Sequence, residues 1–148
     1  MLQSVRDKII TAFVNALESD KWPVYRSRTN PLHRDDSIPS IVVTPIQEQV
    51  AAADHESQER HLSLKVVCFY GDVGIDDESI DQKVEALTSW VESRIQVDET
   101  FGGLANESTM SEWVWHIDAV DEDYIGAEGL LQIKYFTARN APDVPLGA

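Results

Sequence analysis

Cysteine, basic residues and long apolar runs are all scarce in this chain. Its single cysteine, Cys68, cannot form an internal disulfide, so the sequence carries no mark of an oxidised, secreted protein. No apolar run approaches the roughly 20 residues that a membrane-spanning helix needs. The first residues, MLQSVRDKII, mix charges with apolar positions, which is typical of a helix and not of a signal peptide. We therefore expect a protein without a membrane segment, soluble and intracellular while it is made.

Bases are outnumbered by acids, twelve against twenty-six, and the formal net charge is −14. Such a chain repels phosphate, which disfavours gripping or reading nucleic acid as its main role. Two interpretations of the charge stay open. One is an ordinary solvated surface, and the other is a surface that DNA passes without binding.

Apolar residues are plentiful and recur with the spacing of helices. The 148 residues are 43% hydrophobic and include four tryptophans, enough for one domain with its own core. Apolar side chains three and four residues apart predict a helix over residues 2–19, and Pro23 prevents its continuation. The same spacing predicts a second helix over residues 76–95, with its leading acids as N-terminal caps.

Strands are predicted between and after the two helices. The clearest covers residues 60–70, where Leu62, Leu64, Val66, Cys68 and Tyr70 alternate onto one apolar face that should meet the helices. Shorter strands are expected at residues 24–25, 40–44, 112–120 and 130–137.

The connections complete the expected layout. Pro45 should halt one strand, with 47–50 continuing after a bulge and 51–59 forming a hairpin loop or frayed strand ends. Residues 98–106 should form a loose connection with Gly102-Gly103 as its flexible point. The element order predicts an α+β fold over residues 1–140, in which two helices pack on one face of a mainly antiparallel, mixed β-sheet. Residues 141–148, APDVPLGA, are expected to form a flexible C-terminal tail.

The single cysteine could be either a reactive group or part of the core. Cys68 could act as a nucleophile with His116 and Asp118, since a thiolate needs a base and an orienting group. Its neighbours Val66 and Tyr70 on an apolar strand face instead favour a buried cysteine that behaves as a small hydrophobe.

The acids Asp118, Asp121, Glu122 and Asp123 could gather a divalent cation, but their spacing matches no calcium loop and favours a solvated turn. The four histidines lack zinc-site spacing, and phosphate-binding and nucleophile-elbow motifs are absent. We therefore expect no catalytic residues, no metal site and no cofactor.

Surface contacts are the remaining candidates. Arg26, Arg28 and Arg34 place a quarter of the chain's bases in one loop region, where they could grip an acidic neighbour or simply aid solubility. Trp90, Trp113 and Trp115 could mark an interface, although packing in the core is the commoner role of tryptophan.

Three short stretches carry a resemblance to a known family. They are DDSIPSIVV at residues 35–43, WVESRI at 90–95 and LLQIKYFT at 130–137. In this order and at these separations the chain resembles the minor tail protein U of lambda-type tailed bacteriophages, the tail terminator. The resemblance covers most of residues 2–138, and none of its stretches is a catalytic signature.

The resemblance implies a structural virion protein with two helices against a mixed sheet. Members of the family form a hexameric ring that caps the tail tube, stops its polymerisation and offers a joining surface to the head. The implied partners are further copies of this chain, the tail tube protein and a head-completion or connector protein, with DNA passing through the ring unbound. The implied location is the head-proximal end of the virion tail, after assembly in the host cytoplasm.

For such an assembly, the expected subunit or tube contacts are charged residues outside the apolar stripes. They are Arg26, Arg28, Arg34, Asp35, Asp36, Glu92, Arg94, Asp121, Glu122 and Asp123. Two alternatives stay open from the sequence. One is a small acidic metal-dependent hydrolase that uses the carboxylates of residues 118–123, and the other is an adaptor domain with a single protein partner.

Overall fold

A computed structural model describes residues 3–27, 39–70, 80–117 and 125–146. The helices are α1 (Val5–Leu17) and α2 (Ile80–Val97). The strands are β1 (Val24–Arg26), β2 (Ser40–Ala52), β3 (Ser57–Phe69), β4 (Glu107–His116), β5 (Gly126–Ala138) and β6 (Ala141–Pro145). They form one sheet in the order β1-β2-β3-β5-β4, with β6 also pairing with β5.

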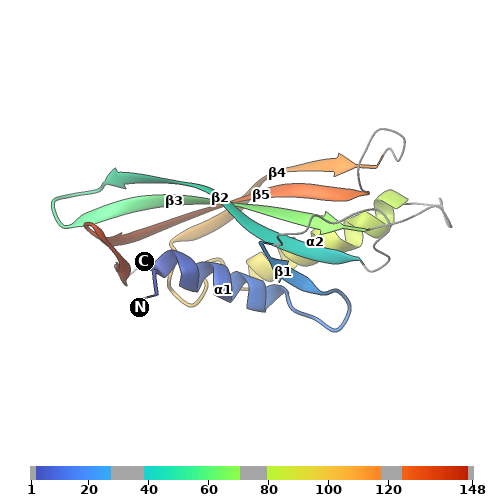
Figure 1. Ribbon diagram of the computed structural model, residues 1–148, viewed down its shortest axis with the longest axis horizontal. Helices are drawn as coiled ribbons and strands as arrows, with labels where there is room; N and C mark the ends of the chain where they lie inside the picture. The colour runs from blue at the N-terminus through green and yellow to red at the C-terminus, as the bar shows by residue number, and fades with distance from the viewer. Residues whose placement is uncertain (1–2, 28–38, 71–79, 118–124, 147–148) are drawn as a thin grey trace.

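Only the β1–β2 pair is parallel among the described strands, and both helices lie along the same side of the sheet (Figure 1). This confirms the prediction of an α+β fold with two helices on one face of a mainly antiparallel sheet. No described helix is long and apolar enough to cross a membrane.

The first helix begins where the sequence offers a cap. The Ser4 hydroxyl accepts a hydrogen bond from the Asp7 N–H at 3.0 Å. The Asp7 carboxylate lies in the first turn, where its negative charge interacts favourably with the positive end of the helix dipole. The helix is shorter at both ends than the predicted residues 2–19. Its apolar stripe is buried as expected, including Ile9, Phe13 and Leu17 at 0% exposure.

The second helix buries the predicted stripe of Val84, Leu87, Val91 and Ile95 and extends two residues beyond it. The leading acids that the sequence assigns as its caps lie outside the described residues.

One face of the sheet carries the core. Leu62, Leu64, Val66 and Cys68 on β3 are buried at 0–1% exposure, which confirms the predicted face, and they join both helices in one cluster. The opposite face holds side chains such as Lys65 and Gln132 that are only partly buried. Over this face Figure 1 draws no described helix.

The predicted stop of β2 at Pro45 is wrong. The strand runs to Ala52, and only the register shifts between Pro45 and Gln47, at the place where a bulge was expected. A proline is tolerated here because β1 pairs only with residues 41–43, so Pro45 lies where β2 has become the edge of the described sheet. The hairpin expected over 51–59 is confirmed, with its turn at residues 53–56 and paired strand ends on either side, since β2 ends at Ala52 and β3 begins at Ser57.

The expected strand at 130–137 is confirmed within a longer strand, whereas the strand expected at 112–120 lies further toward the N-terminus, and residues 118–120 are outside the described ranges. β4 covers Glu107–His116, because its polar first half pairs with β5 and a bulge between Met110 and Glu112 interrupts the alternation that the sequence shows. β5 begins earlier, at Gly126. A Cβ atom at this glycine would lie 2.1 Å from the Cys68 carbonyl oxygen, so the missing side chain permits the pairing of β5 with β3.

The C-terminal segment also differs from the expectation of a tail without structure. Ala141–Pro145 forms β6, and the Leu146 N–H donates to the Phe136 carbonyl at 3.1 Å. The sequence pattern could not predict this strand, because two prolines in five residues argue against a strand unless it lies at the edge of a sheet. That edge position depends on the pairing of β6 with β5.

The connection from α2 to β4 is a hydrogen-bonded turn, contrary to the loose connection expected there. The Asp98 carboxylate accepts from the N–H groups of Thr100 and Gly102 at 3.0 and 2.8 Å. The pKa of Asp98 is lowered, first by the hydrogen bond from the Thr100 hydroxyl and then by these N–H groups. The turn buries Phe101 edge-on against Phe13, with ring centroids 5.7 Å apart.

Candidate functional site

Two side chains of α2 hold the C-terminal end of α1. Trp90 Nε1 donates to the Leu17 carbonyl at 2.9 Å, and Arg94 Nε donates to the Ala16 carbonyl at 2.8 Å. The Arg94 guanidinium also lies over the Trp90 ring, 5.3 Å from its centroid. The last carbonyls of a helix lack intrahelical donors, so these bonds satisfy α1 and join the helices. Arg94 thus has partners in its own chain, and its subunit contact stays a prediction.

Glu92, another predicted contact, faces the edge strand β4. Its Oε1 accepts a hydrogen bond from Trp113 Nε1 at 2.6 Å. The rings of Trp113 and Trp115 are stacked, with centroids 6.1 Å apart and planes 10° from parallel. Trp90 and Trp113 pack partly buried against the core, whereas Trp115 is 46% exposed. Of the three tryptophans, Trp115 therefore offers the most surface to a partner.

Arg26 joins β1 to α1. Its Nη2 donates to Asp7 Oδ1 at 2.7 Å and its Nη1 to Thr11 Oγ1 at 3.3 Å. Hydrogen bonds from Gln3 and then from Arg26 lower the pKa of Asp7. Both partners of this ion pair are more than a third exposed, so solvent screens it and its energy is small. Arg26 thus stays accessible at the β1 flank of the molecule.

The other predicted contacts are not among the residues that the structure describes. They are Arg28, Arg34, Asp35, Asp36, Asp121, Glu122 and Asp123. Asp118, proposed above as a metal ligand and as a partner of Cys68, also lies outside the described ranges.

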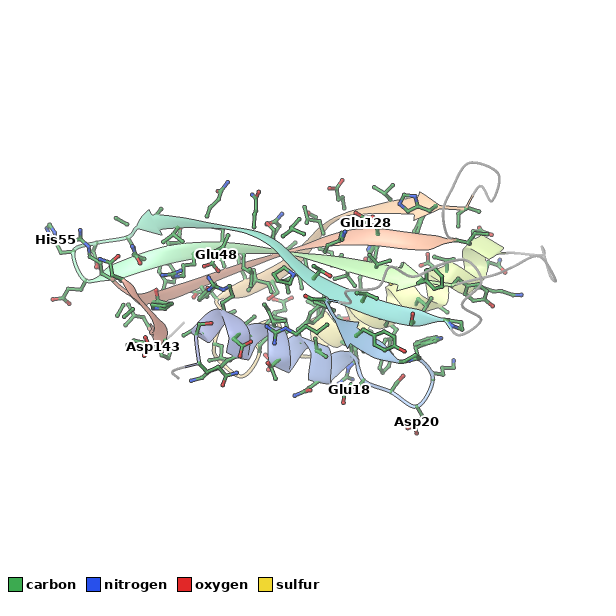
Figure 2. The ribbon with its side chains drawn as sticks, viewed as in Figure 1. Glu18, Asp20, Glu48, His55, Glu128 and Asp143 are labelled. Carbon is green, nitrogen blue, oxygen red and sulfur yellow. The ribbon has the colours of Figure 1, made fainter. Side chains whose placement is uncertain are left out.

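A buried polar network that the sequence did not predict is centred on Glu48 of β2, the residue labelled in Figure 2. Glu48 Oε1 accepts from Arg6 Nη1 at 2.8 Å and from Arg60 Nη1 at 2.9 Å. Glu48 Oε2 accepts from the Tyr135 hydroxyl, and Arg60 Nε donates to Thr137 Oγ1 at 2.9 Å. The Glu48 and Arg60 side chains are each 9% exposed.

The network connects α1, β2, β3 and β5 at the end of the sheet where the β2–β3 hairpin lies. Burial and then the hydrogen bond to Glu48 raise the pKa of Tyr135, so its hydroxyl stays a donor. One signal in the sequence points to the network. Arg60 falls on the same strand face as Leu62 and Leu64, and a charge on a core face requires a partner.

The structure separates the Cys68 and His116 side chains. Cys68 pairs with Ala127 in the sheet, and Ala127 pairs with Trp115, so these three side chains lie on one face. Because side chains alternate along a strand, His116 lies on the other face of the sheet. Cys68 is fully buried, and burial raises the pKa of its thiol. These observations confirm the preferred interpretation of a small buried hydrophobe over that of a nucleophile.

Cys68 is expected to be inert in the folded protein. With a thiol-reactive chromogenic reagent at neutral pH, we expect no more than a few per cent of one thiol to react under native conditions, and one full thiol in urea. The absorbance of the released chromophore measures both. Rapid reaction in the native state would contradict the burial.

The described surface contains grooves but no assembled reactive centre. A groove of about 550 Å³ between the α1–β1 connection and α2 is lined by Trp22 and Trp90, with serines but no histidine among its described lining. A serine without an adjacent base is a poor nucleophile. Within the described ranges, no three His, Cys, Asp or Glu side chains come together as a metal site.

No protein-family model matches the chain, and neither does any curated protein. Among solved structures, the chain is similar to the sheath/tube terminator of an extracellular contractile injection system, PVC, in its extended state. The two are 8% identical with a TM-score of 0.46, and the likeness covers 100% of this chain and 62% of that one.

Proposed function

We propose that this chain is a structural tail protein that assembles into a ring on the end of a tail tube. The ring stops tube polymerisation, offers a joining surface to the head and lets DNA pass. Its subunits are further copies of this chain, and its neighbours are the tube protein and a head-completion protein. The protein acts by assembly and not by turnover of a substrate.

The observation that carries the proposal is where the stretches resembling the tail terminator family fall in the fold. WVESRI lies in α2, where Trp90 and Arg94 hold α1, SIVV opens β2, and LLQIKYFT lies in the central strand β5. They belong to the elements that build the two-helix, one-sheet core, which is the layout that the family implies. The charged flanks at Arg26 and Glu92 lie on different sides of this core and suit contacts that close a ring by rotation.

The proposal is tested by assembly on tubes. The tube protein from the same genome is polymerised with and without this chain, and tube lengths and ends are measured by negative-stain electron microscopy. We expect shorter tubes with a ring at one end, and a multi-subunit mass by light scattering. A chain that stays monomeric at high concentration, with and without Mg²⁺, and leaves tube ends bare would overturn the proposal.

The hydrolase alternative is separated by two substitutions in the same assay. Asp118→Asn and Asp121→Asn remove the carboxylates that a metal would need. We expect tube capping to be retained and calorimetry to detect no tight Mg²⁺ or Ca²⁺ binding in the unsubstituted chain. Tight metal binding that is lost on substitution, together with a lost hydrolytic activity, would favour the enzyme.

A further inference from the structure

In the described part of the sheet, the edge strands β1 and β4 lie in the same rows of paired residues. Residues 24–26 of β1 pair with 41–43 of β2, which pair with 68–66 of β3, then with 127–129 of β5 and 115–113 of β4. β1 and β4 are therefore the opposite ends of one row of strands, as Figure 1 shows. Since β1 is parallel to β2 and each later step is antiparallel, β1 and β4 run in opposite directions.

Beyond its bulge, the end of β4 lacks the features that normally keep an edge strand apart from other chains. No described strand pairs with its outer side, and its segment from Trp113 to Trp115 contains neither lysine nor proline. Val114 and Trp115 are 48% and 46% exposed, on the two opposite faces of the strand. An exposed apolar edge of this kind is a template for pairing with another strand.

The flanks of the two edges differ in charge: the β4 flank is strongly acidic, and the β1 flank is close to neutral. Between Glu92 and His116 the chain has five carboxylates and one base, Arg94, whose guanidinium is engaged with α1. The carboxylates are Glu92, Asp98, Glu99, Glu107 and Glu112. On the other flank, residues 3–27 of α1 and β1 have four bases and three acids. The bases are Arg6, Lys8, Lys21 and Arg26, of which Arg6 is paired with Glu48 and Arg26 with Asp7. An acidic flank and a nearly neutral flank on opposite edges favour head-to-tail contact over contact between like edges.

We propose that the β4 edge of one copy of this chain docks against the β1 edge of a second copy, so that the sheet continues from subunit to subunit. Within one chain β1 and β4 run in opposite directions. If the rotation axis of the ring runs along the strands, the next copy keeps the same strand directions, so β4 of one copy meets β1 of the next antiparallel. Trp115 and Val114 supply the apolar contact, and the acidic and nearly neutral flanks meet beside it. This inference rests on the proposed ring and identifies the surfaces that close it.

Engineered cysteines test which edges meet. Tyr25 and Val114 share one row of the sheet, through Val42, Val67 and Glu128, so the proposed contact brings residue 25 of one copy near residue 114 of the next. Variants Tyr25→Cys and Val114→Cys, one with a mass tag, are mixed and oxidised mildly. The native Cys68 is buried and does not compete. We expect a disulfide between the two variants, identified by electrophoresis and peptide mass.

The controls make each outcome decisive. Ala53→Cys lies exposed in the hairpin turn and is expected to give no link with Val114→Cys. A Val114→Cys protein that links mainly to itself would mean that like edges meet, and would overturn the proposal. Rings on tube ends without any 25–114 link would overturn this inference and leave the proposed function standing. A monomer that leaves tubes bare would overturn both.

A second measurement does not depend on cysteines. Trp115→Ser removes the most exposed tryptophan of the docking edge, and we expect association to weaken at least roughly tenfold by light scattering. Glu112→Lys should weaken it as well, because it replaces a carboxylate of the acidic flank with a base. Glu56→Lys, in the exposed hairpin turn, is the matched charge control. Unchanged association of Trp115→Ser would contradict the proposed edge.

Discussion

Replacing Glu48 with alanine is expected to lower the free energy of unfolding by about 3–5 kcal/mol. The substitution leaves the Arg60 guanidinium, 9% exposed, without the carboxylate that accepts its Nη1 hydrogen bond at 2.9 Å. It also removes the acceptor of the Tyr135 hydroxyl, which is almost completely buried. Urea unfolding followed by tryptophan fluorescence measures the loss.

Two further variants separate the charge from other effects of the substitution. Glu56→Ala removes a carboxylate from the exposed hairpin turn and should change the stability by no more than about 0.5 kcal/mol. The double variant Glu48→Leu with Arg60→Leu replaces the buried ion pair by apolar groups. It should be considerably more stable than Glu48→Ala, since no charge is then left buried without a partner. Equal losses for both would mean that packing, not charge, explains the effect.

Replacing Phe13 with alanine is expected to cost about 3–5 kcal/mol. The side chain is fully buried where α1 meets the sheet, and its ring packs edge-on against Phe101 of the α2–β4 turn. The substitution leaves a cavity between the helical layer and the turn. The same urea titration measures the loss of unfolding free energy. An unchanged slope of this free energy against urea concentration would indicate that unfolding remains two-state.

Phe136 is the matched control for Phe13. It lies on β5 but on the face of the sheet over which no described helix packs, and its ring is only partly buried, with Lys134 Nζ 5.8 Å from its centroid. We expect Phe136→Ala to cost less than half as much as Phe13→Ala, because less apolar surface is withdrawn from water. A loss as large as that of Phe13→Ala would show that this face holds a second core.

The fold class and the central elements could be predicted because their signal is local. On β3 the alternation of Leu62, Leu64 and Val66 identifies the buried face, and in α2 the spacing of Val84, Leu87 and Val91 does the same. Burial on one side of an element leaves a periodic trace in its own residues. The same reasoning correctly placed Cys68 in the core.

The candidate contact residues could be chosen only by charge, and charge does not show what a side chain binds. Arg94 donates to the end of α1, and Glu92 accepts from Trp113. Both partners are far away along the chain, so no spacing in the sequence indicates them. The Glu48 network was missed for the same reason, because Arg60 and Tyr135 meet only through strand pairing, and Arg6 joins them only when α1 lies against the sheet.

The sequence by itself determined the two helices, the clearest strand and the face on which the core is built, since these depend on the order of apolar and polar residues within one element. Tertiary structure alone decided that β2 passes through Pro45, that β5 begins at Gly126 and that β6 exists. Strand ends depend on backbone partners from other parts of the chain, and such partners leave no periodic pattern in the strand itself. The same pairing places β1 and β4 at opposite edges of the sheet.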